Sequence, residues 1–399
     1  MPFLARFMNV LSVFRPERTR LFHLIATAAL SPIGAAAGPL MIGAIVLLDA
    51  APAMGQCAQT GTTENCSGNL PPSIDFNTNL GIDTLNVFNA SNGTSFARLQ
   101  GTGTMPTNGA NATFSCSVAN ECTITTNTDG SQSCSPKTDI HGNPLGACIA
   151  GTTTGGPSGH AGPNVTVKVA TPTSGPITIG ASRPNIAVIG LSRGSDGGGG
   201  GNSYVAGSAG NGGTGADGGT ASVDFSGVVP NGNFGGILAE SQAGNGGNGG
   251  SFFGIGGSAG NGGLGGFGGA SAAGFDAGSI TTSGKGNVGV TAISQGGNGG
   301  SAGNGGGLVF VGGSGSGAGQ AGKAEVDTVA GTSIVTFGDF ANGIAAYSFG
   351  GGGGSGSGGF GLFFSGGGNG STGGAGGQVI VNANGAITTE GQFAEGILA

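Results

Sequence analysis

The chain has 399 residues, of which 96 are glycine, and charged residues make up only 7% of it. Globular domains average about 7% glycine and about 25% charged residues, so this composition excludes an ordinary globular protein and charge-rich disorder. With 11 basic and 18 acidic residues the net charge is −7, which excludes a nucleic-acid-binding protein because few cations are available to neutralise phosphates.

Residues 1–53 have the composition of an export signal. A basic segment comes first, with arginines at four positions: Arg6, Arg15, Arg18 and Arg20. Residues 21–48 carry no Asp, Glu, Lys or Arg, and Ala51-Pro52-Ala53 is a small-x-small site for a signal peptidase. We therefore expect a helical signal over 1–53 that directs the chain to the Sec export machinery and is cleaved after Ala53. An uncleaved N-terminal anchor is the alternative.

Six cysteines follow the signal and lie before residue 150: Cys57, Cys66, Cys116, Cys122, Cys134 and Cys148. An even number of cysteines after an export signal indicates disulfides formed in an oxidising compartment. Pairing of sequence neighbours, 57–66, 116–122 and 134–148, is the simplest arrangement. Zinc binding is the alternative, although the closest spacing is C-x₅-C and zinc sites use shorter spacings.

The remainder, residues 163–399, contains a repeat of about 50–54 residues. Its clearest marker is a serine, found at Ser192, Ser241, Ser294 and Ser348, with spacings of 49, 53 and 54 residues. About 14 residues before most of these serines stands an apolar-Thr pair, as in ITT at 280–282, and a further copy begins at Gly396 and is truncated. Alternating, β-branched segments separated by Gly, Asn and Asp predict three or four short strands in each repeat.

One such repeat is too small to bury its apolar face, but stacked repeats bury it between them. We therefore expect an all-β fold, a right-handed parallel β-helix (solenoid) with glycine-rich loops over 163–399. Residues 54–162 are expected to form a cysteine-containing N-terminal cap or linker. Equivalent residues of successive repeats should form ladders along the stack. One inward-facing row is expected to hold Ile237, Val290, Ile344 and Ile397.

The glycine-rich runs carry glycine at every third position, as at Gly260, Gly263, Gly266 and Gly269. Collagen shares this period but requires abundant proline, which these runs lack. Flexible surface loops are the interpretation that we favour. Ordered three-fold polyglycine helices, hydrogen-bonded sideways to their neighbours, are the alternative. Apolar clusters within the runs, such as Phe363-Phe364, are expected to dock on the solenoid.

No motif predicts catalysis or a bound cofactor or metal. GLSRG at 190–194 fits a nucleophile elbow, but Ser192 occupies the shared serine position of the repeat. GGTGADGGT at 212–220 is similar to a calcium-binding nonapeptide, but Gly219 stands where a large apolar residue is required. His141 and His160 lie in a polar Gly/Pro-rich stretch that is typical of solvated loops. We expect the protein not to be an enzyme.

One repeat carries a family pattern. Residues 334–351, IVTFGDFANGIAAYSFGG, match I-x-T-x-G-x-x-A-x-G-I-x-A-x-S-x-G-G at each fixed position, and residues 387–399 match until the chain stops. This pattern resembles the passenger region of α-proteobacterial autotransporters (type V secretion). The resemblance implies a β-helical passenger exported through the periplasm to the cell surface, outer membrane or medium, with a structural or adhesive role. The family's C-terminal β-barrel is missing, so the chain is expected to be part of a longer protein. The six cysteines also depart from the family.

The expected partners are few. An open end of the stack would expose unpaired strand edges and favour self-association. The resemblance implies adhesion, aggregation or host contact, but the sequence identifies neither a host nor a neighbouring-cell target. A secreted glycine-rich structural cell-envelope protein is the alternative function, similar in GNGG composition to the mycobacterial glycine-rich repeat family. Ice or surface binding by bundled glycine helices is a third option.

Overall fold

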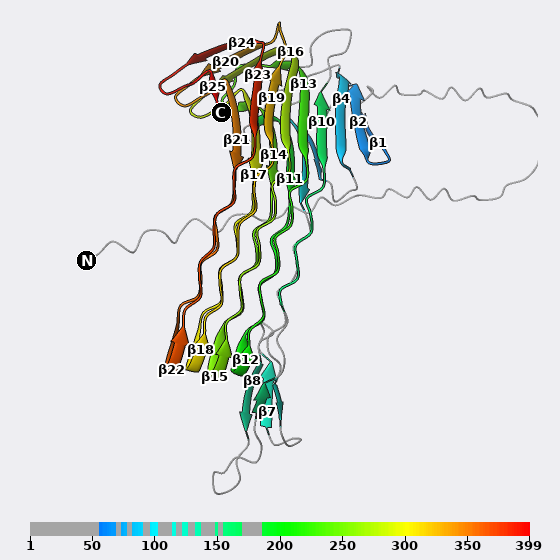
Figure 1. Cartoon of the computed structure of the whole chain (residues 1–399). Helices are drawn as coiled ribbons and strands as arrows, with labels where there is room; N and C mark the ends of the chain where they lie inside the picture. Colours follow the sequence, from blue (N-terminus) through cyan, green and yellow to red (C-terminus); the bar gives the residue numbers. More distant parts are fainter. Residues whose placement is uncertain are drawn as a thin grey trace, which may run out of the picture. The chain divides into compact units, whose positions relative to one another are not determined.

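The computed structural model describes residues 56–68, 73–77, 82–90, 96–102, 114–116, 122–126, 132–136, 148–150, 155–169 and 186–399. The predicted signal, its cleavage site at Ala53 and His141 lie outside these residues. Within them the fold is all-β, without helices, and its larger sheets are mostly parallel (Figure 1). This confirms the predicted all-β class. No helix long and apolar enough to span a membrane occurs in the described residues.

Two large sheets contain most of the strands. The ten-stranded sheet consists of β1 (Gln56–Thr60), β2 (Thr63–Gly68), β4 (Thr84–Ala90), β10 (Val165–Val169), β13 (Ala221–Val229), β16 (Ser271–Ser283), β19 (Ala324–Thr328), β20 (Ser333–Phe337), β23 (Val379–Ala383) and β24 (Ala386–Glu390). The seven-stranded sheet consists of β3 (Ser73–Asn77), β5 (Phe96–Thr102), β11 (Ile186–Arg193), β14 (Gly235–Gln242), β17 (Val290–Gln295), β21 (Ile344–Phe349) and β25 (Ile397–Leu398).

Three smaller sheets complete the fold. A four-stranded sheet, named here the tip sheet, consists of β12 (Ser203–Ser208), β15 (Phe252–Ser258), β18 (Gly305–Val311) and β22 (Gly359–Gly366). Two antiparallel pairs lie in the cysteine-containing region: β6 (Phe114–Cys116) with β9 (Cys148–Ala150), and β7 (Cys122–Thr126) with β8 (Gln132–Pro136).

Successive repeats pair in parallel and in register. The shared serines lie opposite one another along the seven-stranded sheet, as Ser241 does with Ser294. The predicted row of Ile237, Val290, Ile344 and Ile397 is confirmed as a register ladder, and its first three members are fully buried. The fourth, Ile397, is partly exposed at the end of the stack.

The main core lies between the two large sheets. Alternation sets its composition, because every second residue of β13 is buried and the others are only partly so. Phe225 and Phe275 stack in this core with ring centroids 5.8 Å apart, and smaller residues such as Val167, Val223 and Val326 fill the rest. The preceding region joins the same stack, since β4 pairs with β10 and β5 pairs with β11. The boundary at residue 163 stays a prediction.

The glycine-rich runs are ordered, so the favoured interpretation as flexible loops was wrong. In each repeat one run leaves the seven-stranded sheet for the tip sheet, and a second returns to the ten-stranded sheet (Figure 1). We call these the outgoing runs (196–202, 245–251, 298–304 and 351–358) and the returning runs (209–219, 260–269, 313–322 and 367–377). Their amides bond to carbonyls of other runs, so the alternative of hydrogen-bonded three-fold helices describes them better.

Candidate functional site

The outgoing and returning runs form a two-layer slab held by backbone hydrogen bonds. Between the layers, N–H groups of Gly213, Gly247 and Gly263 donate to the carbonyls of Gly198, Gly213 and Gly247, each over 2.8 Å. Within the outgoing layer, Gly246 donates to Asn298 over 2.8 Å, and three residues on, Gly249 donates to Ser301 over 2.9 Å. This period of three is that of an extended helix with three residues per turn.

The same period explains why two of every three slab positions are glycine. A Cβ on Gly247 would overlap the carbonyl oxygen of Gly198, and one on Gly300 would overlap that of Gly247. The third position of each turn faces outward and holds the side chains of the GNGG motifs. The glycine period in the sequence therefore follows from the close packing of neighbouring runs in the slab.

Outward-facing Asn and Asp side chains link one run to the next. The Oδ1 of Asp196 accepts the N–H of Asn245 at 2.7 Å, and the Oδ1 of Asn245 accepts the N–H of Asn298 at 2.9 Å. Asp217, from the calcium-like motif, accepts the N–H of Phe267 at 2.7 Å in the same manner. A shallow polar groove of about 410 Å³ runs over this face between Asp196 and Asn248. These side chains satisfy amides that would otherwise face only water.

The shared serine fastens the slab to the seven-stranded sheet. Ser294 Oγ donates to the carbonyl of Gly269 at 2.7 Å and accepts the N–H of Gly322 at 2.8 Å. Ser241 and Ser348 repeat both contacts one repeat away. Ser192 is buried and donates to the carbonyl of Pro163 at 2.6 Å. These bonds give the serine a structural role at every copy.

The tip sheet closes the end of the slab. The N–H of Gly210 donates to the carbonyl of Gly201 at 2.8 Å, so the chain reverses direction within β12, where the register shifts after Val205. Phe252 and Phe310 point inward and stack with centroids 6.4 Å apart, forming a second small core with Ala209 and Ala259. Docking of apolar clusters is therefore confirmed only for these inward positions.

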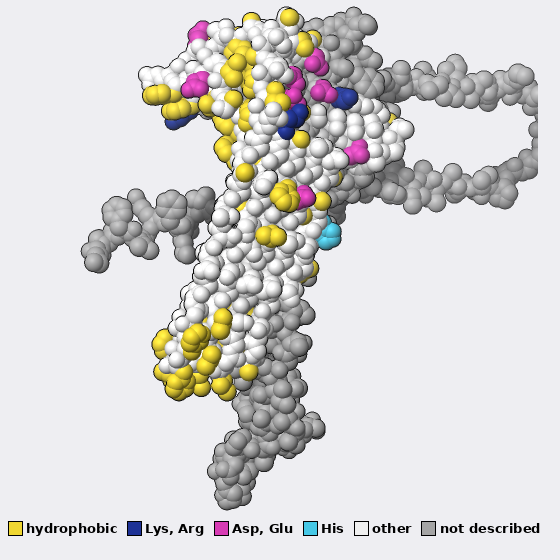
Figure 2. All heavy atoms as spheres, viewed as in Figure 1, with side chains coloured by type: hydrophobic (Ala, Val, Ile, Leu, Met, Phe, Trp, Pro, Cys, Tyr) yellow, Lys and Arg dark blue, Asp and Glu magenta, His cyan; other side chains and the backbone are white. Residues whose placement is uncertain are grey.

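The opposite face of the tip sheet is apolar and exposed (Figure 2). Its exposed side chains are Phe253, Ile255, Leu308, Val309, Val311, Phe360, Leu362, Phe363 and Phe364. The expectation that Phe363-Phe364 docks on the solenoid was wrong, since both rings are exposed. This face was not predicted from the sequence because buried and exposed members of one cluster, such as Phe252 and Phe253, are adjacent in the chain. The signal available was their alternation within a strand.

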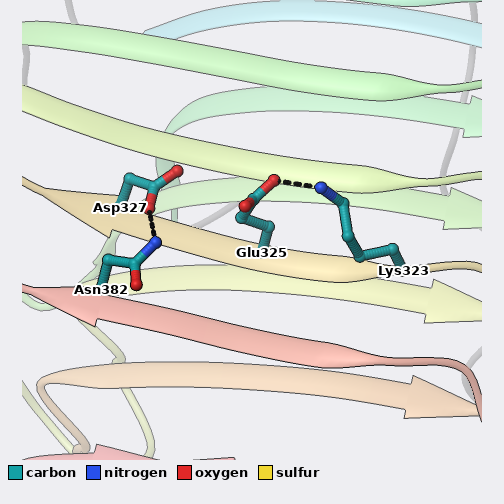
Figure 3. A network of polar contacts seen from close by, with 4 residues as sticks. All are labelled: Lys323, Glu325, Asp327 and Asn382. Carbon is teal, nitrogen blue, oxygen red and sulfur yellow. Dashed lines mark hydrogen bonds and ion pairs between the residues drawn. The ribbon is translucent and has the colours of Figure 1, made fainter.

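The ten-stranded sheet carries a polar row on its outer surface. Lys323 forms an ion pair with Glu325, and Asn382 of β23 donates to Asp327 of β19 at 2.6 Å (Figure 3). Farther along the row, desolvation raises the pKa of Asp276, and the negative charges of Asp224 and Asp327 raise it further. In the seven-stranded sheet, desolvation raises the pKa of Glu240 against the opposing effect of Arg193.

The cysteines are only partly described. Cys57 and Cys66 form a disulfide with an S–S distance of 2.04 Å, the first of the expected neighbour pairs. Together with Glu64 they are the only metal-ligating cluster in the described part, and oxidised cysteines supply no thiolate for zinc. The β6–β9 register places Cys116 opposite Cys148, and the β7–β8 register places Cys134 opposite Ile124. Pairings of the other four cysteines stay predictions.

Comparison with known proteins adds no relative. The chain matched no protein-family model, no curated protein and no solved structure.

Proposed function

We propose that the chain is a right-handed parallel β-solenoid that serves as an exported structural or adhesive scaffold of the autotransporter-passenger type. The observation that carries this proposal is the in-register pairing of equivalent strands from repeat to repeat in all three larger sheets. Each repeat then adds one layer to a stack and repeats every surface group at a regular spacing. Repetition suits multivalent contact with an extended partner, in which avidity exceeds the affinity of each contact.

The residues of the candidate chemical motifs support a structural role. Ser192, Ser241 and Ser294 are buried and bonded to main-chain groups, and Asp217 links neighbouring runs. No catalytic reaction, cofactor or metal is therefore part of the proposal. Within the described chain, β23, β24 and β25 have a strand partner on one side only, which favours self-association along the stack.

Export by the Sec route to the cell surface, outer membrane or medium is part of the same proposal. The test is production of the full chain in a Gram-negative host, with fractionation and sequencing of the N-terminus of the recovered protein. We expect a mature chain that starts at Met54 and is found outside the cytoplasm. Recovery in the cytoplasm with Met1 intact would contradict export.

The hydrogen-bonded slab favours a second candidate, a secreted glycine-rich structural protein of the cell envelope. A slab stabilised by main-chain bonds needs no ligand to serve as a wall or coat component. The two candidate functions can be distinguished by how the protein is released from cells. An envelope component would stay in the insoluble envelope fraction after washing with salt and detergent, whereas a passenger would be released by external protease.

A further inference from the structure

The tip sheet leaves an apolar face uncovered in the middle of the stack as well as at its end. Strands β15 and β18 each have a neighbouring strand on both sides. Even so, Phe253 is 51% exposed, Ile255 62% and Val309 41%. Addition of further repeats would not bury these side chains, because they point away from the slab and not along the stack. Their exposure is a property of every repeat that carries them.

The exposed side chains line up into one surface. Phe253 and Phe360 lie in the same register row across Gly306, and Val309 lies opposite Phe364. In each of the strands β15, β18 and β22 the register is interrupted where the chain reverses. The residues at these interruptions are Ile255, Leu308, Leu362 and Phe363. Figure 2 shows this apolar surface at the end of the slab. The four phenylalanines alone expose about 500 Å², an apolar patch of the size that marks an interaction site.

Apart from Asp196 and Asp217 at the sheet-proximal ends of the first runs, the runs and strands of the slab and tip carry no charged side chain that would attract a charged partner. Residues 197–216, 243–275, 296–322 and 349–378 contain no Asp, Glu, Lys, Arg or His. Strands β15, β18 and β22 also lack Trp, Tyr and Arg, the residues that dominate contacts between proteins. Phe, Leu, Ile and Val are instead the side chains that transfer most favourably into a bilayer.

The main chain of the tip is also suited to an apolar environment. An unpaired N–H or C=O group costs several kcal/mol in hydrocarbon, which normally keeps irregular backbone out of lipid. Here parallel pairing joins β12, β15, β18 and β22, and inter-run bonds continue directly behind them. Shallow insertion of the tip would therefore bury apolar side chains while the inner strands keep their hydrogen bonds.

We propose that the exposed face of the tip sheet is a membrane-contact surface that inserts into the outer leaflet of an uncharged, zwitterionic lipid bilayer. A chain with a net charge of −7 and no basic residue in the described tip strands β12, β15, β18 and β22 gains little from anionic headgroups. Binding should therefore depend on apolar transfer and not on salt. The proposal goes beyond the scaffold role, which stands if lipid binding fails.

The test is flotation of the full chain with phosphatidylcholine vesicles. Phe363→Ser removes a ring that is 78% exposed at the tip, and Phe393→Ser is the matched control, since its ring is 74% exposed on a turn after β24. We expect Phe363→Ser to weaken partition by about tenfold. Ile255→Ser should weaken it in the same direction, from a strand that is paired on both sides. The control should stay within about twofold of the original protein, and circular dichroism establishes that each variant keeps its β structure.

Three results would overturn the proposal. The first is failure of the original protein to float with phosphatidylcholine vesicles. The second is binding of both tip variants at the level of the control. The third is a requirement for phosphatidylglycerol with loss of binding in 1 M NaCl, which would indicate electrostatic adsorption. Light scattering in the absence of lipid distinguishes the other occupant of this face. A dimer that Phe363→Ser dissociates and Phe393→Ser does not would assign the face to a second copy of the chain.

Discussion

At the scale of single residues, the structure depends on glycine and on the hydroxyl groups of serine and threonine. Glycine at two of three slab positions lets carbonyl oxygens and α-carbons of neighbouring runs approach closely, as at Gly247 and Gly300. The shared serine of each repeat, and the threonine in the repeats that have one, satisfy main-chain groups where the chain changes direction. Thr282 Oγ1, for example, donates to the carbonyl of Asn287 at 3.0 Å. A slab stabilised in this way is sensitive to added volume at its inward positions and tolerant at its outward ones.

Gly300→Ala tests the close approach within the slab. The added methyl group overlaps the carbonyl oxygen of Gly247, so neighbouring runs must separate and lose hydrogen bonds. We expect a loss of about 1–3 kcal/mol in the free energy of unfolding. Ser301→Ala, one residue away at an outward position, should change it by less than about 0.5 kcal/mol. Equal effects of the two substitutions in denaturant unfolding would contradict the packing described here.

Ser294→Ala tests the junction between slab and sheet. The substitution leaves the carbonyl of Gly269 and the N–H of Gly322 without their side-chain partner next to a buried position. The expected loss of stability is about 1–3 kcal/mol. Ser371→Ala, at an exposed position of a returning run, serves as the control in the same thermal unfolding experiment. An unchanged melting temperature in Ser294→Ala would show that the serine does not stabilise the junction between slab and sheet.

At the scale of elements, repetition made the strands predictable and hid the order of the runs. The apolar-Thr pairs at 280–282 and 334–336 and the serine marker predict β16, β20 and β17 with their ladders, because strand period and repeat register are both visible in sequence. The runs were misjudged because glycine has high conformational freedom, and only neighbouring runs supply bonds that order it. The exposed face that contains Phe253 and Phe363 forms where the chain reverses direction. Because glycine is abundant throughout the runs, its positions in the sequence do not show where these reversals occur.

An element-scale prediction concerns Asp276, which lies in β16 where its register against β13 shifts. Partial desolvation of this largely exposed side chain, and the negative charges of Asp224 and Asp327, raise its pKa above the ordinary value of 3.8. A raised carboxyl pKa favours folding while the group is protonated, and this contribution is lost as the pH rises through the raised pKa. Asp276→Asn should therefore raise the melting temperature at pH 7, and the difference should vanish below pH 3.8. A constant difference across this pH range, or a lower melting temperature at pH 7, would contradict this assignment.

At the scale of the whole molecule, one repeat performs two structural tasks. Its sheet strands build a core from apolar side chains, and its glycine runs build a slab from the main chain and end in an apolar face. Charged residues are also distributed unevenly between the two parts. Residues 243–275 and 296–322, which include runs of the slab and strands of the tip sheet, contain none. Stacking such repeats multiplies both parts together, which supports the scaffold role that we propose.

The central claim is that the glycine runs are hydrogen-bonded layers and not linkers. Hydrogen–deuterium exchange of the full chain, followed by mass spectrometry on peptides from 245–251 and 260–269, tests it directly. We expect amide protection of more than about a hundredfold in these peptides, comparable with that of strands β14 and β17. Exchange of these amides at the rate of an unstructured chain, alongside protected strands, would contradict the account.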